Sequence, residues 1–336
     1  MTQGLLTGLV RLEKVRYLMS TLLVCSCLLT AHAQQAPQFT MGMLNKYNHN
    51  PAYGGMDASL SISAFIKTQW QQFPGQPRFQ HITAHMPLYI ANGGMGVKVY
   101  RDQIGVEQLL GFEVSFNYVY ETDFGLFSGG IGAGITQMSL DGSLLRSPDG
   151  LYEGNTIIHN DPILSSTNGS GLAPALSLGV YFTNDYLEAG ISVDQALSSM
   201  ITLSNDQSTS FQMKRNFYGF AEYLLQYSEA IEIYPSIMLK SDLVQTQIDL
   251  SARVVYQDLY FGGLSFRGYS ANTIDAVGVI LGTRVNPQLS VAYAYDITLS
   301  DIRLFSDGTH ELLVQYNLNK PLGIGRPERI IYNPRF

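Results

Sequence analysis

Hydrophobic and polar residues alternate along most of the chain after residue 57. The clearest stretches are EVSFNYVY (113–120), QIDLSARVVY (247–256) and LSVAYAYDIT (289–298). In each of them every second residue is apolar, and the residues between are mainly Ser, Asn, Asp, Glu, Ala or Arg. Because successive side chains of a strand point to opposite faces, this pattern predicts β-strands with one apolar and one polar face.

About fourteen such segments follow one another, a number within the range of outer-membrane barrels. Many exceed the roughly 9–11 residues that cross a bilayer at a tilt, whereas ordinary strands average about 5–6 residues. We therefore predict an all-β fold, a single transmembrane antiparallel β-barrel, with a soluble all-β protein as the alternative. The predicted strands are 57–69, 78–89, 92–103, 106–121, 124–140, 170–183, 185–193, 213–228, 230–241, 247–257, 259–267, 273–285, 287–297 and 308–318.

The links between these segments predict which ends of the strands lie together. Links after the even-numbered segments are short, and those after the odd-numbered segments are longer, above all 141–169, 194–212 and 298–307. Short turns at one end and long loops at the other are typical of outer-membrane barrels. Since lipid offers no hydrogen bonds to an open sheet edge, we expect the first and last strands to pair and close the ring.

The beginning of the chain predicts export. Basic residues precede an apolar stretch, YLMSTLLVCSCLLT (17–30), which is followed by Ala31-His32-Ala33, an A-x-A cleavage site. We predict a signal peptide over residues 1–33. Cys25 and Cys27 lie in its apolar part, where they loosely resemble a lipoprotein signal or are small apolar residues that are removed. The mature chain then contains no cysteine and no thiolate chemistry.

Composition narrows the possible partners. Charged residues are 14% of the chain, against about 25% in an ordinary soluble domain. The 27 Asp and Glu exceed the 20 Lys and Arg. Nucleic-acid binding is not expected of an acidic chain, because phosphate contacts need Lys and Arg.

Two motifs look like cofactor sites but do not fit one. His81 and His85 have the spacing of a helical zinc pair, but in a strand they would lie roughly 13 Å apart. The stretch GGIGAG (129–134) lacks the glycine spacing and the following helix of a dinucleotide loop. Glycines in a barrel strand more often permit bending or close packing of a neighbour. We expect no cofactor.

Two further patterns concern metal binding and catalysis. Asp141, Asp149, Glu153 and Asp161 could hold calcium in a loop, but they lack an EF-hand order, and solvated loop charge is the better interpretation. A lipase would need a base such as His159 or His310 beside a serine, and no spacing fixes that geometry. Gly263-Leu264-Ser265-Phe266-Arg267 is not a nucleophile elbow, because Arg267 replaces the last glycine. We expect no enzymatic activity.

Two early blocks of the sequence carry specific motifs. The first, QQAPQFTMGMLNKYNHNPAYGG (34–55), ends on Asn50 and Pro51 through Tyr53 to Gly55. It resembles the N-P-A-Y-x-G signature of the PorP/SprF family of type IX secretion system outer-membrane proteins. The second, KTQWQQFPGQP (67–77), is similar to the family's R-x-Q-W-x-x-F-x-G-x-P block. It has Lys67 in place of arginine.

Blocks near the end of the chain extend this resemblance. YDITLS (295–300) and GTHELLVQYN (308–317) are similar to the family's late strand motifs, with Thr309 in place of serine, and NPRF (333–336) resembles its terminus. The resemblance implies the outer membrane of a Gram-negative, Bacteroidota-type bacterium and a role in type IX secretion. It implies machinery components and a secreted gliding-adhesin-type protein as partners, besides membrane lipid.

These observations predict four segments and one function. The segments are a signal peptide (1–33), a periplasmic or lumen segment (34–56), the barrel (57–320) and a tail (321–336). We expect the barrel to dock, export or anchor a secreted surface protein; a diffusion channel, or porin, is the alternative. The candidate docking residues are Asn50, Pro51, Tyr53, Trp70, Phe73 and Pro77.

The single tryptophan of the chain predicts a feature of the barrel mouth. Trp70 follows the first strand, and Pro74-Gly75-Gln76-Pro77 kinks the first loop after it. The indole can lie at the boundary between lipid and water. The kinked loop could form a lid or a docking surface over the mouth, and a simple girdle residue is the alternative for Trp70.

Overall fold

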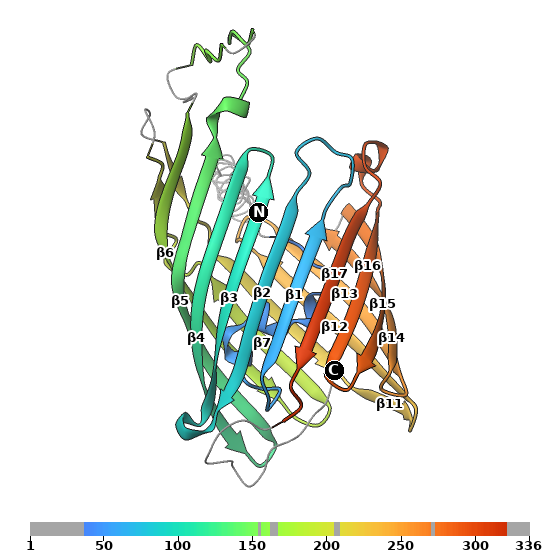
Figure 1. Cartoon of the computed structure of the whole chain (residues 1–336). Helices are drawn as coiled ribbons and strands as arrows, with labels where there is room; N and C mark the ends of the chain where they lie inside the picture. The colour runs from blue at the N-terminus through green and yellow to red at the C-terminus, as the bar shows by residue number, and fades with distance from the viewer. Residues whose placement is uncertain (1–36, 154–155, 162–166, 205–208, 270–272, 321–336) are drawn as a thin grey trace, which may run out of the picture. The chain divides into compact units, whose positions relative to one another are not determined.

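The described part of the chain is a closed antiparallel β-barrel (Figure 1). The structure, a computed structural model, describes residues 37–153, 156–161, 167–204, 209–269 and 273–320. The predicted signal peptide and the tail 321–336 lie outside the described residues. Within these residues, all helices are short 3-10 turns, and none has the length and apolar character needed to cross a membrane.

Fourteen strand positions form the wall, as predicted. One of them is divided between two strands, β10 and β11, with Leu224 between them. The wall strands are β1 (Ser61–Thr68), β2 (Arg78–Leu88), β3 (Gly93–Ile104), β4 (Glu107–Thr122), β5 (Gly125–Asp141), β6 (Asn168–Thr183), β7 (Leu187–Asp194), β10 (Asn216–Tyr223), β11 (Leu225–Ser228), β12 (Ile231–Ser241), β13 (Thr246–Tyr256), β14 (Tyr260–Tyr269), β15 (Thr273–Asn286), β16 (Leu289–Thr298) and β17 (Thr309–Asn317).

The ring closes where the first strand meets the last. Lys67 of β1 lies opposite Phe79 of β2 on one side and opposite Glu311 of β17 on the other. Each wall strand is antiparallel to both of its neighbours, and β10 joins β7 to β12. The predicted pairing of the first and last strands is confirmed.

Alternate side chains face the lumen and the outside, as the pattern of the sequence predicts. In β4, Glu113 and Ser115 are buried inside, while Val114 and Phe116 are 41% and 39% exposed outside. In β16, Ala294 and Asp296 are buried, and Tyr293 is exposed. An apolar outer band with a polar interior is the arrangement that a bilayer requires of a barrel.

Two details differ from the predictions. The link between β3 and β4 is the two-residue turn Gly105-Val106, although it lies on the long-loop side. The predicted loop 194–212 contains a small hairpin of β8 (Met200–Thr202) and β9 (Ser210–Gln212). This hairpin packs through Ile201 against Met138 and Ala173, whose side chains face inward, so it covers part of the inner wall.

Residues 37–58, hereafter the plug, run through the ring. The plug contains three 3-10 turns, η1 (Gly42–Leu44), η2 (Lys46–Asn48) and η3 (Pro51–Tyr53). Most of its residues are buried. Phe39, Met41 and Leu44 pack in one cluster with apolar residues of the inner wall, and Tyr47, Ala52 and Tyr53 pack in a second cluster. The core of this barrel therefore lies in its lumen.

Candidate functional site: the lumen and the long-loop mouth

The local sequence of the plug shapes its last turn. Asn50 lies just before η3, where its side-chain oxygen accepts a hydrogen bond from the backbone N–H of Ala52 at 2.9 Å. Pro51 occupies the first position of the turn, where a backbone N–H would lack a partner. The signature N-P-A-Y thus forms a capped turn through contacts within the plug alone.

The wall holds Asn50 from two strands. Its Nδ2 donates to the carbonyl oxygen of Val180 at 2.9 Å, and the carbonyl oxygen of Ile191 lies at 3.5 Å. Gly179 and Gly190 permit this approach, because a Cβ at these positions would come within 2.0 Å and 2.8 Å of the Asn50 amide. Asn50 is fully buried.

A buried ion-pair cluster lies at the middle of the plug. Lys46 Nζ lies 2.5 Å from Glu188 of β7 and 2.8 Å from Glu222 of β10. Burial of an unpaired ammonium would be costly, but two carboxylates at this distance compensate its charge. Lys46 is therefore held as a cation. Arg253 supports the cluster from β13, 3.7 Å from Glu222.

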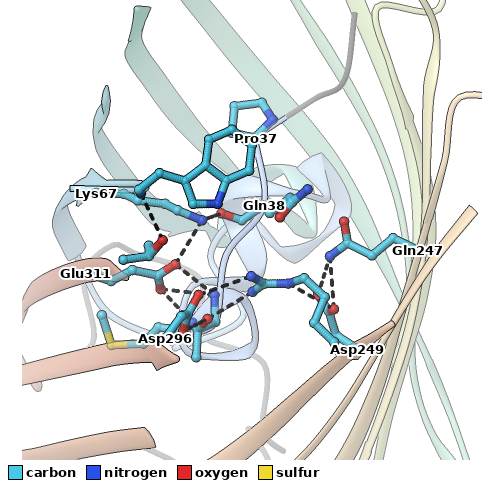
Figure 2. Close-up of polar contacts among 12 residues, drawn as sticks. Pro37, Gln38, Lys67, Gln247, Asp249, Asp296 and Glu311 are labelled. Carbon is cyan, nitrogen blue, oxygen red and sulfur yellow. Dashed lines mark hydrogen bonds and ion pairs between the residues drawn. The ribbon is translucent and has the colours of Figure 1, made fainter. Parts of the chain in front are cut away.

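A second cluster lies near the amino end of the plug (Figure 2). Glu311 of β17 accepts hydrogen bonds from the backbone N–H groups of Thr40 and Met41 at 2.9 Å, and Lys67 Nζ lies 3.3 Å away. This carboxylate therefore joins the plug to both strands that close the ring.

Arg267 extends the second cluster across the lumen. Its guanidinium lies 3.2 Å from Asp249 of β13 and 3.1 Å from Asp296 of β16. It also donates to Thr40 Oγ1 at 2.9 Å. A buried cation with two carboxylates and a plug hydroxyl is well compensated, whereas an unpaired buried charge is costly.

The predicted histidine pair belongs to the same interior. His81 and His85 both face inward from β2. His81 Nε2 lies 3.0 Å from Asn45 Nδ2, and His85 Nδ1 accepts from the backbone N–H of Gly55 at 3.1 Å. The two histidines thus contact different parts of the plug. Among the described residues, His, Cys, Asp and Glu side chains form no group of three that could hold a metal ion.

His49 is a titratable plug residue that lies among aromatic rings. Its ring lies 5.3 Å from Phe39 and 5.0 Å from Tyr218 between ring centroids. Burial among these rings disfavours the charged form of the imidazole.

The signature residues lie inside the barrel, while the loop residues lie at its mouth. Asn50, Pro51 and Tyr53 are buried against the wall, and their predicted docking role stays a prediction. Trp70 is half-buried and adopts a left-handed backbone conformation, with φ of 54°. Phe73 is 36% exposed and meets the Trp70 ring edge to face, with centroids 6.4 Å apart.

Hydrogen bonds tie the first loop to the rim. The backbone N–H of Gln71 donates to Gly308 at 2.8 Å, and that of Asp307 donates back to Gln71 at 3.0 Å. On the other side the backbone N–H of Gly105 donates to Gly75 at 3.0 Å. Pro77 closes the loop by accepting from Gln69 at 2.9 Å. The kinked loop is thus fixed between its two neighbours.

The last long loop presents further apolar side chains beside the first. Leu304 and Phe305 are 74% and 70% exposed at the end of the turn η6 (Asp301–Leu304). We call Trp70, Phe73, Leu304 and Phe305 the rim surface. Figure 1 shows these two loops next to each other at the upper end of the barrel. Apolar side chains on a fixed loop are typical of sites for protein partners.

The other candidate residues make local contacts. His159 is buried between the Tyr152 hydroxyl and the carbonyl oxygen of Gly142, at 3.0 Å each. His310 Nδ1 lies 2.6 Å from the Tyr293 hydroxyl. Asp141 accepts from the backbone N–H of Ser143 at 3.0 Å, which caps a short turn. These contacts order the loops and the rim.

The luminal charges were not predicted from the sequence. Charged side chains make the main polar contacts between plug and wall, and none of them was a candidate site residue. They are Lys46, Glu188, Glu222, Arg267 and Glu311. A signal was present, because charged residues recur at the inward positions of the alternating strands. Charges that all face a narrow lumen require partners there.

Comparisons with known proteins agree with this architecture. The family model of the type IX secretion system membrane protein PorP/SprF matches residues 31–316. A comparison with curated protein sequences finds no significant match. Both results concern the sequence and are independent of the folded structure.

Solved structures with a similar fold are outer-membrane barrels. The CymD monoaromatic hydrocarbon channel is 10% identical, with a TM-score of 0.50, over 86% of this chain and 94% of that chain. The toluene transporter TbuX of Ralstonia pickettii is 10% identical, with a TM-score of 0.48, over 82% and 92%. Likeness at this level of identity concerns the fold alone. By its barrel and by the match over most of its length, the chain is an outer-membrane protein that belongs to the PorP/SprF family of type IX secretion system membrane proteins.

Proposed function

We propose that this barrel is a docking component of the secretion system, which helps export or anchor a secreted surface protein such as a gliding adhesin. The observation that carries the proposal is the filled lumen. The plug occupies the ring, and two cavities that lie beside it measure about 30 and 20 Å³. A partner protein then has the loops, the turns and the outer wall for contact.

The rim surface is the part of the barrel best suited to such a partner. It is apolar, it lies at the long-loop mouth, and hydrogen bonds between loops hold it in place. A surface that is already ordered loses little conformational entropy on binding. The proposal requires no catalysis. It places the barrel in a Bacteroidota-type outer membrane, as family membership suggests.

Two measurements test the proposal. In planar bilayers we expect no steady conductance from the purified barrel, whereas the porin alternative requires an open pore. In cells we expect Phe73→Ala combined with Phe305→Ala to reduce the secreted protein retained at the surface several-fold. Phe124→Ala is the matched control, since Phe124 is 65% exposed in a turn at the opposite end of the barrel.

Either of two results would contradict docking at the rim. One is a steady ohmic conductance of the intact protein. The other is unchanged surface retention in the double variant when the barrel is present at normal abundance. Loss of retention in Phe124→Ala alone would move the contact to the short-turn side.

A further inference from the structure

The plug crosses the lumen in one direction, and its contacts show which end lies at which mouth. At its amino end, the carbonyl oxygen of Pro37 accepts from Lys240 Nζ at 3.0 Å, and that of Gln38 accepts from Lys67 Nζ. Lys67 is the second-to-last residue of β1, and Lys240 is the second-to-last residue of β12. Both strands end there on the long-loop side, so Pro37 lies toward the long-loop mouth.

The other end of the plug contacts the wall strands at their opposite ends, on the short-turn side. Ser128, near the start of β5, donates to the carbonyl oxygen of Ala52 at 2.6 Å. His85, near the end of β2, accepts from Gly55. Ser59 then exchanges hydrogen bonds with the backbone of Lys320, after the last strand. Residues 52–59 therefore lie at the short-turn mouth.

The long loops of outer-membrane barrels face the outside of the cell. We propose that the mature chain enters its own lumen from the cell-surface mouth at Pro37, and that the barrel closes around a plug that is already in place. This inference does not rest on docking, only on the orientation of the barrel in the membrane.

Late insertion of the plug into a finished barrel conflicts with the packing. Lys46 lies between carboxylates of two wall strands at mid-lumen, and Gly130 leaves space for the plug backbone, since a Cβ there would come within 2.4 Å of Ala52. A plug that slid into a closed ring would enter at the short-turn mouth, where it joins β1, and would have to carry residues 37–45 past Glu188, Glu222 and the close-packed backbone at Gly130. Closure of the wall around the plug avoids that passage.

Single cysteines test the direction of the plug, because the sequence after residue 33 contains none. The variants are Pro37→Cys, Leu304→Cys as the cell-surface control, and Asp258→Cys in a short turn at the opposite end. The contact of Pro37 with Lys240 uses the backbone and survives the substitution. With a membrane-impermeant maleimide on intact cells, we expect labelling of Pro37→Cys and Leu304→Cys, with Asp258→Cys labelled only after the outer membrane is opened.

Labelling of Pro37→Cys only after opening of the membrane, or no labelling in the folded barrel, would overturn the proposed direction. A protease-sensitive peptide inserted before Pro37 gives a second measurement. External protease should cut it in intact cells that contain heat-modifiable barrel, and full protection there would also overturn the proposal.

Discussion

Lys46 is the residue on which the seating of the plug depends most directly. It is buried between Glu188 and Glu222, so its loss leaves two carboxylates close together without their cation. Removing one partner of a buried ion pair typically costs about 3–5 kcal/mol. Lys46→Met should lower the midpoint temperature at which the folded barrel loses its fast migration in gels. Adding Glu188→Gln should restore part of the loss, and an unchanged midpoint in the single variant would contradict the role of Lys46.

Two neighbouring glycines of β5 provide a matched comparison of the inner and outer wall. A Cβ on Gly130 would come within 2.4–2.6 Å of the plug backbone at Ala52, whereas a Cβ on Gly129 would meet nothing within 4 Å. We expect Gly130→Ala to reduce barrel stability by about 1–3 kcal/mol, as overpacking does. Gly129→Ala should be close to neutral in the same gel assay. Equal effects of the two changes would show that the plug does not press on this strand.

At the scale of the element, the plug predicts a pH dependence through His49. Protonation of His49 in the seated plug would bury a charge among aromatic rings, whereas the ring of a released plug is protonated near the ordinary histidine pKa of about 6.5. Released plug therefore binds a proton more readily than seated plug, and seating should weaken as the pH falls below about 6.5. Above pH 7 this contribution is constant.

The measurement is the unfolding midpoint of the barrel in detergent at pH 7.5 and at pH 4.5. Wild-type protein should lose more stability on acidification than His49→Phe, which keeps a ring of similar size but cannot be protonated. His81, Lys98 and Lys240 face His49 and remain in both proteins, so their titration affects the two alike. An equal loss in both proteins would remove His49 as the cause.

The strands could be predicted from the sequence, because alternation is a local property. In LSVAYAYDIT (289–298), Ala294, Asp296 and Thr298 are buried on the lumen face, and Tyr293 and Ile297 are exposed on the outer face, as the alternation predicts. The break between β10 and β11 and the β8–β9 hairpin were missed. The hairpin depends on packing against distant parts of the wall, for example of Ile201 against Met138.

The plug could be only partly predicted from the sequence. The NPAYGG signature marked residues 50–55 as important, but its partners are 130 and 141 residues away, at Val180 and Ile191. No period in the sequence connects such positions. The spacing of His81 and His85 predicted that they share one face of a strand. Their contacts with the plug could be identified only in the structure.

At the scale of the whole molecule, the plug makes the lumen a protein core. Porin barrels leave their interior to water, while here Phe39, Met41 and Leu44 pack against the inner wall. Charged clusters at the middle and upper levels then join plug and wall. The family resemblance predicted the outer membrane and the secretion-system family correctly, and the filled interior supports the proposal that a partner contacts surfaces of the barrel and not a pore.

The wall is also uneven in height, and this gives the mouth a direction. β4, β5 and β6 have 16, 17 and 16 residues, whereas β1 has 8 and β17 has 9. At about 3.3 Å per residue, a strand like β5 is on the order of 56 Å long, well beyond the roughly 25 Å apolar band even when tilted. The taller side therefore acts as a screen above the membrane (Figure 1). The proposed partner would then approach obliquely, from the low side where the first and last strands meet, which is also where the rim surface lies.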